Sequence, residues 1–149
     1  MVRSTTVSTV LPDESTSFGQ QVARRLREDL IGWLTTVGMD GTPQPNPVWF
    51  LWDGEKLLVY NMPDARRLVN IQRNPKVSFH LNSAAGGGGI IVLTGEAKVS
   101  ASEKPAHEVP GYVAKYQQHV TGSDLSSMQS MAEQYSVALH IRPTKVRGF

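Results

Sequence analysis

Two adjacent arginines, Arg66 and Arg67, follow an apolar stretch that ends at Tyr60, within the segment YNMPDARRLVNIQRNP of residues 60–75. A guanidinium presents a planar fork of donors that matches phosphate oxygens, and such charge-assisted bonds are about twice as strong as neutral ones. Amide groups at the start of a short helix over residues 64–73 would add a partial positive field. The pair could therefore hold an anion at the end of a strand, but on these residues alone a solvated helix face is the favoured interpretation.

The other side chains offer no catalytic machinery of their own. The four histidines lie far apart and show no metal-ligand spacing. The chain has no cysteine, no GxSxG nucleophile motif and no Walker-type phosphate loop, and its paired acids fall in an arm or in helices. We therefore expect no metal site, and no catalytic residue is assigned. If the protein is an enzyme, a bound cofactor must carry the chemistry.

Composition places the chain among ordinary globular proteins. Its 149 residues fit one domain, which we predict over 18–149 after a flexible N-terminal arm over 1–17. The net charge of +2 is small and the bases are scattered, so the sequence predicts no nucleic-acid-binding face. No apolar run reaches the roughly 18 residues of a membrane span, and the first residues lack an apolar secretory region. We expect a cytoplasmic protein.

The elements that must position the arginines alternate between helical and strand-like patterns. A stripe of Phe18, Val22, Leu26 and Leu30 predicts a first helix that packs on a sheet, with its arginines solvated. Asp40-Gly41 and Asp53-Gly54 predict tight hairpin turns, so the first three strands would form an antiparallel meander. The predicted strands cover 30–37, 47–52, 56–62, 76–83, 90–101 and 136–143. This pattern predicts a mainly β fold with flanking helices, a small closed or split barrel.

Two further segments lie between these strands. The glycine-rich stretch 84–89 is interpreted as a mobile hairpin loop that covers a site, and residues 102–135 form a long insert with helical character. If the protein is an enzyme, these segments would help to decide which substrate it accepts.

Four stretches carry a resemblance to a known family: WLTTVGMDGTPQPNPVWFLWDGEKLLVYN, ARRLVNIQRNPKVSF, LTGEAKV and IRPTKVRGF. In this order the chain resembles the flavin and deazaflavin oxidoreductases of the split β-barrel, pyridoxamine 5'-phosphate oxidase-like superfamily. The likeness is closest to the actinobacterial branch that uses the deazaflavin coenzyme F-420. It covers residues 18–101 and 136–149, and it implies a six-stranded antiparallel split β-barrel of the FMN-binding type.

The resemblance also implies a cofactor site. Arg67 occupies the basic position that holds the cofactor phosphate, Arg66 is its neighbour, and Asn70 either bonds near the phosphate or stabilises this turn. Further residues lie where family members surround the flavin-type ring with backbone amides and apolar surface: Val48, Trp49, Tyr60, Asn61 and Met62. Trp49 has a core or dimer role as its alternative. Phe149 stands where relatives often carry a tryptophan.

By this resemblance the protein is expected to transfer a hydride from reduced F-420 to a small organic acceptor, with solvent or Tyr60 as the proton donor. The alternatives are an FMN-dependent oxidase or reductase of the same superfamily, and a non-catalytic flavin- or heme-binding or sensor protein. The family builds its site between two subunits, which implies a homodimer. The aromatic residues Trp33, Trp49, Phe50 and Trp52 agree with this, because one thin barrel does not readily bury them all.

Overall fold

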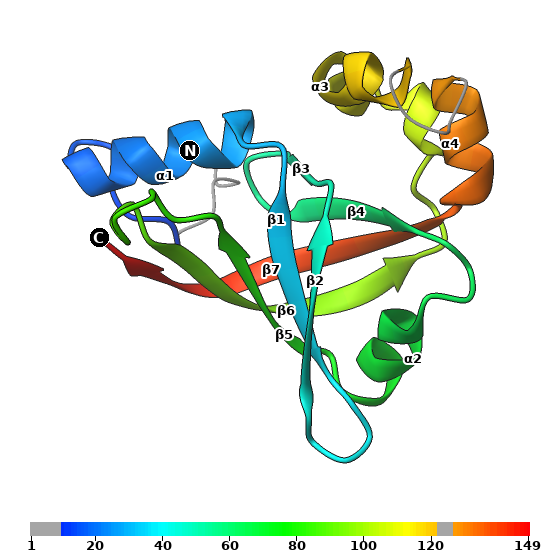
Figure 1. Ribbon diagram of the computed structural model, residues 1–149, viewed down its shortest axis with the longest axis horizontal. Helices are drawn as coiled ribbons and strands as arrows, with labels where there is room; N and C mark the ends of the chain where they lie inside the picture. Colours follow the sequence, from blue (N-terminus) through cyan, green and yellow to red (C-terminus); the bar gives the residue numbers. More distant parts are fainter. Residues whose placement is uncertain (1–9, 122–126) are drawn as a thin grey trace, which may run out of the picture.

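One antiparallel sheet that curls into a half-barrel forms the centre of the computed structural model, which describes residues 10–121 and 127–149 (Figure 1). Its seven strands follow the order β2-β1-β5-β6-β7-β4-β3. The strands are β1 Gly32–Val37, β2 Pro43–Val48, β3 Leu51–Trp52, β4 Leu57–Asn61, β5 Lys76–Leu81, β6 Ile91–Ser100 and β7 Val137–Gly148. The helices are α1 Ser17–Glu28, α2 Arg66–Arg73, the 3₁₀ turn η1 Ala106–Glu108, α3 Pro110–Thr121 and α4 Met128–Gln134. The predicted mainly β fold with flanking helices is confirmed.

The structure has seven strands instead of the predicted six, because the stretch predicted as one strand over 47–52 is divided. β2 pairs with β1 at one edge of the sheet, and β3 pairs with β4 at the other edge. The predicted meander of the first three strands is therefore wrong. Only Trp49 and Phe50 join the two edges, and so short a connection spans no more than about 11 Å. The two edges must therefore lie close together, which curls the sheet.

Strand β2 leaves its outer edge without hydrogen-bond donors. The Gly38 amide donates to the Thr42 carbonyl at 2.9 Å, so the even-numbered residues that follow direct their backbone groups toward β1. The odd-numbered positions, which point away from β1, are Pro43, Pro45 and Pro47. Proline has no N–H group, so this edge presents carbonyl acceptors alone and cannot pair fully with another strand. The opening of the half-barrel therefore stays unpaired on this side.

Strand β4 lies between two apolar clusters, and all five of its residues are buried. Leu57 and Val59 belong to the main core inside the barrel, whereas Leu58 and Tyr60 belong to a second cluster with the helices between β6 and β7. This position explains why the stretch reads as a continuous apolar run instead of alternating. The strand thus links the barrel to the helical insert.

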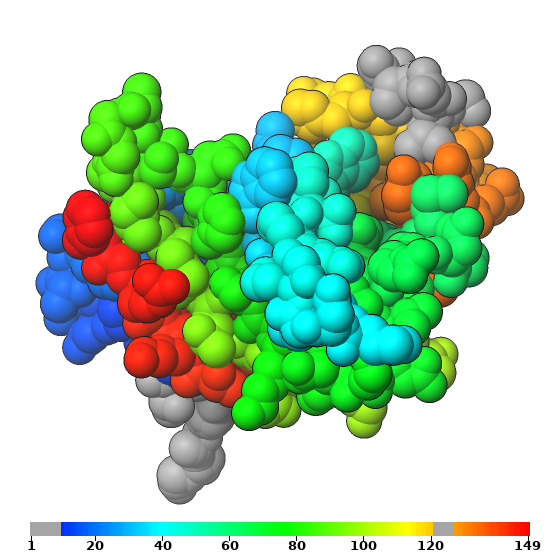
Figure 2. Space-filling model, turned by 60° about the horizontal axis from the view of Figure 1, so that its bottom comes forward, coloured from blue at the N-terminus to red at the C-terminus, as the bar shows by residue number. Residues whose placement is uncertain are grey.

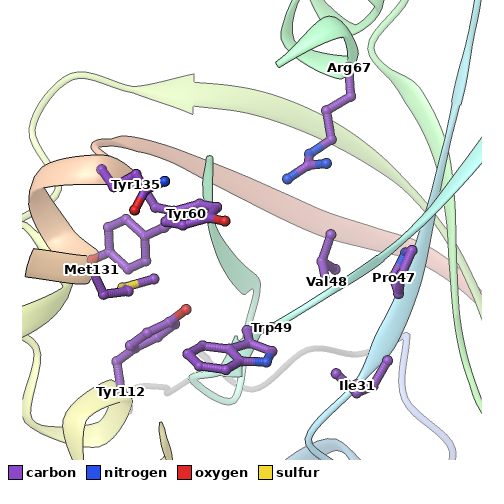
Figure 3. A pocket seen from close by; sticks show the side chains of 10 residues that line it. Ile31, Pro47, Val48, Trp49, Tyr60, Arg67, Tyr112, Met131 and Tyr135 are labelled. Atoms are coloured by element: carbon purple, nitrogen blue, oxygen red, sulfur yellow. The ribbon is translucent and has the colours of Figure 1, made fainter. Parts of the chain in front are cut away.

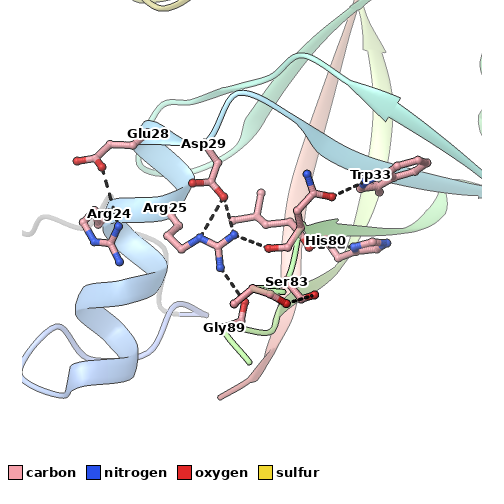
Figure 4. Close-up of polar contacts among 11 residues, drawn as sticks. Arg24, Arg25, Glu28, Asp29, Trp33, His80, Ser83 and Gly89 are labelled. Carbon is pink, nitrogen blue, oxygen red and sulfur yellow. Dashed lines mark hydrogen bonds and ion pairs between the residues drawn. The ribbon is translucent and has the colours of Figure 1, made fainter. Parts of the chain in front are cut away.

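Helix α1 is confirmed, and its Thr16 hydroxyl accepts a hydrogen bond from the Gly19 amide at 3.0 Å. The prediction that its arginines are solvated is wrong for Arg25 (Figure 4). That guanidinium bonds the Asp29 carboxylate at 2.6 and 3.0 Å, and it donates to the Gly89 carbonyl at 2.7 Å. It also donates to the Asn82 carbonyl at 2.6 Å. Arg25 therefore attaches the glycine-rich segment to α1.

The predicted N-terminal arm lies partly outside the described residues, which begin at residue 10. Within the described part, Leu11 packs against the barrel core just before α1. Among the helices of the described residues, none is long and apolar enough to cross a membrane.

Candidate functional site

A cavity of about 440 Å³ opens between β2, α2 and the helical insert (Figure 3). This volume lies within the range of roughly 300–1,000 Å³ that small-molecule and cofactor sites occupy. The lining residues come from the residue before β1, from the end of β2, from the two-residue crossing Trp49–Phe50 that joins β2 to β3, from β4, from α2 and from the insert. They are Ile31, Pro47, Val48, Trp49, Tyr60, Arg67, Tyr112, Met131, Gln134 and Tyr135. Segments far apart in the sequence therefore meet at one site.

Arg67 is the second residue of α2, and its side chain reaches into the cavity (Figure 3). Its Nε donates to the Asn61 side-chain oxygen at 2.6 Å. Asn61 is fully buried, and its amide nitrogen donates to the carbonyls of Val59 and Val137 at 3.1 and 3.0 Å. These contacts hold Asn61 in one orientation, so that it aims the guanidinium.

The remaining donors of Arg67 are free for a ligand. Within the described residues, neither of its two Nη groups has a hydrogen-bond or ion-pair partner. Burial lowers the pKa of Arg67, and the nearby Tyr135 opposes this effect, but a guanidinium remains charged in proteins. The cavity therefore contains a positive charge with two unused donor groups, which is the arrangement that a phosphate or carboxylate binds.

Trp49 forms a flat wall of the cavity because helix α3 holds it from behind. Its ring stacks on Tyr116, with centroids 4.5 Å apart and an interplanar angle of 7°. The Tyr116 hydroxyl accepts from the Phe50 amide at 2.9 Å and lies 2.7 Å from the Leu30 carbonyl. A side chain of α3 thus provides the hydrogen-bond partner for the Phe50 amide, which no neighbouring strand pairs. This contact is the physical reason that the predicted strand breaks at Trp49 and Phe50.

The helical insert supplies the wall across the cavity from Pro47 and Val48 (Figure 3), and the lining residues of this wall are Tyr112, Met131, Gln134 and Tyr135. Tyr112 packs edge-on against Tyr60, with centroids 5.0 Å apart. The Tyr60 hydroxyl donates to the Lys104 carbonyl at 2.6 Å. Burial, with a smaller contribution from Glu103, raises the pKa of the Tyr60 phenol far above its usual range, so Tyr60 stays neutral.

Sequence reasoning named none of the four insert residues. The resemblance covered this segment only by position, and two helices from an insert can pack in many ways. One signal was available, because Tyr112 and Tyr116 are spaced by four and share one face of α3.

The residues predicted to hold a cofactor divide into three groups. Four of them line the cavity, namely Val48, Trp49, Tyr60 and Arg67. Asn61 does not line the cavity, but its side-chain oxygen accepts a hydrogen bond from Arg67 Nε. The remaining three, Met62, Arg66 and Asn70, do not line it either.

The last three have distinct surroundings. Arg66 is exposed, and Met62 is half-buried just beyond the end of β4. The Asn70 amide is buried and donates to the Thr36 hydroxyl at 3.0 Å and to the Gln44 side chain at 2.9 Å. Asn70 therefore joins α2 to the β1–β2 hairpin, and Figure 2 shows this hairpin standing forward on the surface beside α2.

Two further expectations concern regions beside the cavity. The prediction that the glycine-rich loop 84–89 covers the site is wrong for this cavity, because none of its residues lines it and Arg25 attaches it to α1. Over residues 10–121 and 127–149, no group of three or more His, Asp or Glu side chains could hold a metal ion.

Comparison with known proteins places this chain in one family. The model of the pyridoxamine 5'-phosphate oxidase family matches residues 18–149, so the chain belongs to that family. No curated protein matches the sequence significantly.

Solved structures share the fold. An F-420 reductase is 25% identical with a TM-score of 0.63, and the match covers 83% of this chain and 94% of that one. A conserved hypothetical protein from Mycobacterium tuberculosis is 22% identical with a TM-score of 0.68, over 96% and 88% of the two chains. The heme storage protein HutZ from Vibrio cholerae is 15% identical with a TM-score of 0.63, over 89% and 95%. The half-barrel thus occurs in proteins named for different ligands.

Proposed function

We propose that the protein is an oxidoreductase that transfers a hydride from the reduced deazaflavin coenzyme F-420 to a small organic acceptor. The observation that carries this proposal is the Arg67 guanidinium, which faces the cavity with two unused donor groups. Family membership supports a flavin-type cofactor, and the likeness to an F-420 reductase supports the deazaflavin. When bound, the reduced coenzyme supplies the hydride, and the chain supplies binding, orientation and exclusion of water.

The lining residues fit such a coenzyme. Arg67 would hold its phosphate, and Asn61 would orient Arg67 through the bond at 2.6 Å. The flat surface of Trp49 and the apolar surface of Val48 suit a planar ring system. Met62, Arg66 and Asn70 remain part of the proposed cofactor-binding set, Asn70 by holding α2 in place and Arg66 as an outer charge.

We further propose a symmetric homodimer with the site at the subunit interface. Trp33, Trp49 and Trp52 are only half-buried in the single chain, which agrees with a covering partner. Phe50 does not contribute to this argument, because it is fully buried within the chain itself.

Titration of the purified protein with F-420 and with FMN tests the cofactor assignment. Arg67→Ala should weaken binding of the preferred cofactor by about 1.5–3 kcal/mol, or roughly tenfold to more than a hundredfold, because a charged hydrogen bond is lost. Arg66→Ala is the matched control, since it removes the same charge from the adjacent exposed position and should change affinity by less than about threefold.

Each result assigns the site differently. Equal affinities of the parent and Arg67→Ala would contradict the phosphate role of Arg67. Tight binding of FMN without binding of F-420 would assign the protein to the FMN-dependent members. Binding without consumption of the reduced cofactor by any acceptor would favour a carrier or sensor.

A further inference from the structure

Lys115 attaches helix α3 to the crossing behind the wall that Trp49 forms. Its Nζ donates to the Phe50 carbonyl at 2.9 Å and lies 3.8 Å from the centre of the Phe50 ring. The centre of the Tyr116 ring, which stacks on Trp49, is 5.3 Å from the same nitrogen. Lys115 is not among the residues that line the cavity, so it forms a place of its own in the fold.

The charge on Lys115 has no carboxylate paired with it. Over residues 10–121 and 127–149, no acidic oxygen lies within ion-pair distance of its Nζ. Asp29 acts on this charge from the end of α1, but the Asp29 carboxylate is bonded by Arg25 at 2.6 Å. Tyr116 stays neutral, because burial raises the pKa of its phenol far above the usual range. The side chain is half-buried, so its ammonium loses part of its hydration without a bonded counter-ion in return.

These surroundings favour the neutral amine. Burial lowers the pKa of Lys115 to about 8, so a substantial fraction carries no charge near neutral pH. A lysine in water, with a pKa of about 10.4, is almost entirely ammonium at the same pH. Only the neutral amine has a lone pair that can attack an acyl carbon, and desolvation is one of the ways in which lysine nucleophiles are activated.

We propose that Lys115 is the preferred site at which small acyl phosphates acylate this protein, and that the acyl group loosens the wall formed by Trp49. The Nζ lone pair attacks the acyl carbon, and a C–N bond forms. The C–O bond to phosphate breaks, phosphate leaves, and the amine proton goes to water. The product keeps one N–H group and carries no charge, so it holds the Phe50 carbonyl less strongly than the ammonium does.

Treatment with acetyl phosphate followed by mass spectrometry measures the acetylation rate at each lysine. At a pH of about 7.5, the rate at Lys115 should exceed the rate at Lys104 by about tenfold, because the larger neutral fraction outweighs the weaker nucleophilicity of a less basic amine. Lys104 is the internal control, since it is exposed in the same insert. The rate at Lys115 should level off once the pH passes its pKa of about 8. A rate no greater than that of Lys104, or one that still rises steeply at high pH, would overturn the assignment of the site.

Lys115→Arg separates acylation at this position from acetylation elsewhere. Arginine keeps the charge and the donors and is not acylated by this reagent. After equal treatment, the parent should lose near-ultraviolet circular dichroism from the stacked Trp49 and Tyr116, whose rings are 4.5 Å apart, and Lys115→Arg should keep it. Equal spectra of the two treated proteins would overturn the effect on the wall. Both measurements use the protein without cofactor, so their outcome and that of the F-420 titration are independent.

Discussion

The Tyr116 hydroxyl forms hydrogen bonds with backbone groups that have no strand partner, at and near the Trp49–Phe50 crossing between β2 and β3. It accepts from the Phe50 amide at 2.9 Å, and its one proton can go to the Leu30 carbonyl at 2.7 Å. The Phe50 carbonyl, 3.0 Å away, also accepts from Lys115 Nζ at 2.9 Å. Replacing Tyr116 with phenylalanine keeps the ring against Trp49 but leaves the buried Phe50 amide without a partner.

The expected loss of stability follows from these contacts. A buried donor without a partner costs about 1–3 kcal/mol, and the lost O–H donor bond adds about 1 kcal/mol. Tyr116→Phe should therefore lower the free energy of unfolding by about 2–4 kcal/mol. Equilibrium urea unfolding measures this change, and the slope against urea should stay the same if the fold is kept.

Tyr112→Phe is the matched control, one helical turn earlier on the same face of α3. Within the described residues, the Tyr112 hydroxyl has no hydrogen-bond partner, so this variant should lose less than about 0.5 kcal/mol. Equal losses in the two variants, or a Tyr116→Phe protein as stable as the parent, would refute the argument that this hydroxyl holds the crossing.

Two further predictions concern Lys115 and the β2 edge. Burial lowers the pKa of Lys115 to about 8, and Asp29 opposes this shift. In the unfolded chain the pKa returns to its ordinary value of 10.5, so the unfolded chain binds this proton more tightly than the folded chain does. The free energy of unfolding should therefore rise with pH from about 8 toward 10 in the parent and less so in Lys115→Met, and identical pH profiles would contradict this. Replacing Pro43 and Pro45 together with threonine adds two outward N–H groups to the β2 edge, so the variant should form assemblies larger than the dimer proposed for the parent. Sedimentation velocity measures this, and parent-like sediment profiles at every concentration would show that the prolines do not protect the edge.

Local chemistry made most of the elements predictable. The apolar stripe of α1 and the two Asp-Gly turns depend on neighbouring residues, and Gly41 and Gly54 adopt the positive φ angles of 88° and 96° that such turns require. The division at Trp49 was not predictable in this way. It depends on Tyr116, which lies 66 residues away from Phe50 and replaces strand pairing by side-chain bonds.

The candidate site likewise combines features that local sequence predicts with features that depend on distant residues. The basic pair after an apolar strand is a local pattern and was visible in the sequence, and the family resemblance selected Arg67 from this pair. The orientation of Arg67 was not predictable, because that depends on Asn61, which is itself held by a carbonyl of β7. The chemical difference between Arg66 and Arg67 is absent from the sequence, since only the direction of each side chain on α2 makes one exposed and the other a lining residue.

By itself, the sequence determined the mainly β architecture, the absence of cysteine chemistry and the presence of a basic pair, Arg66 and Arg67, after a strand. These properties follow from residue types, their periodicity and turn residues, which act over a few positions. The tertiary structure alone decided that the sheet closes on a two-residue crossing and that the insert forms the second wall of the cavity. Both depend on contacts between distant segments, whose free energy comes from packing and burial that no local pattern encodes.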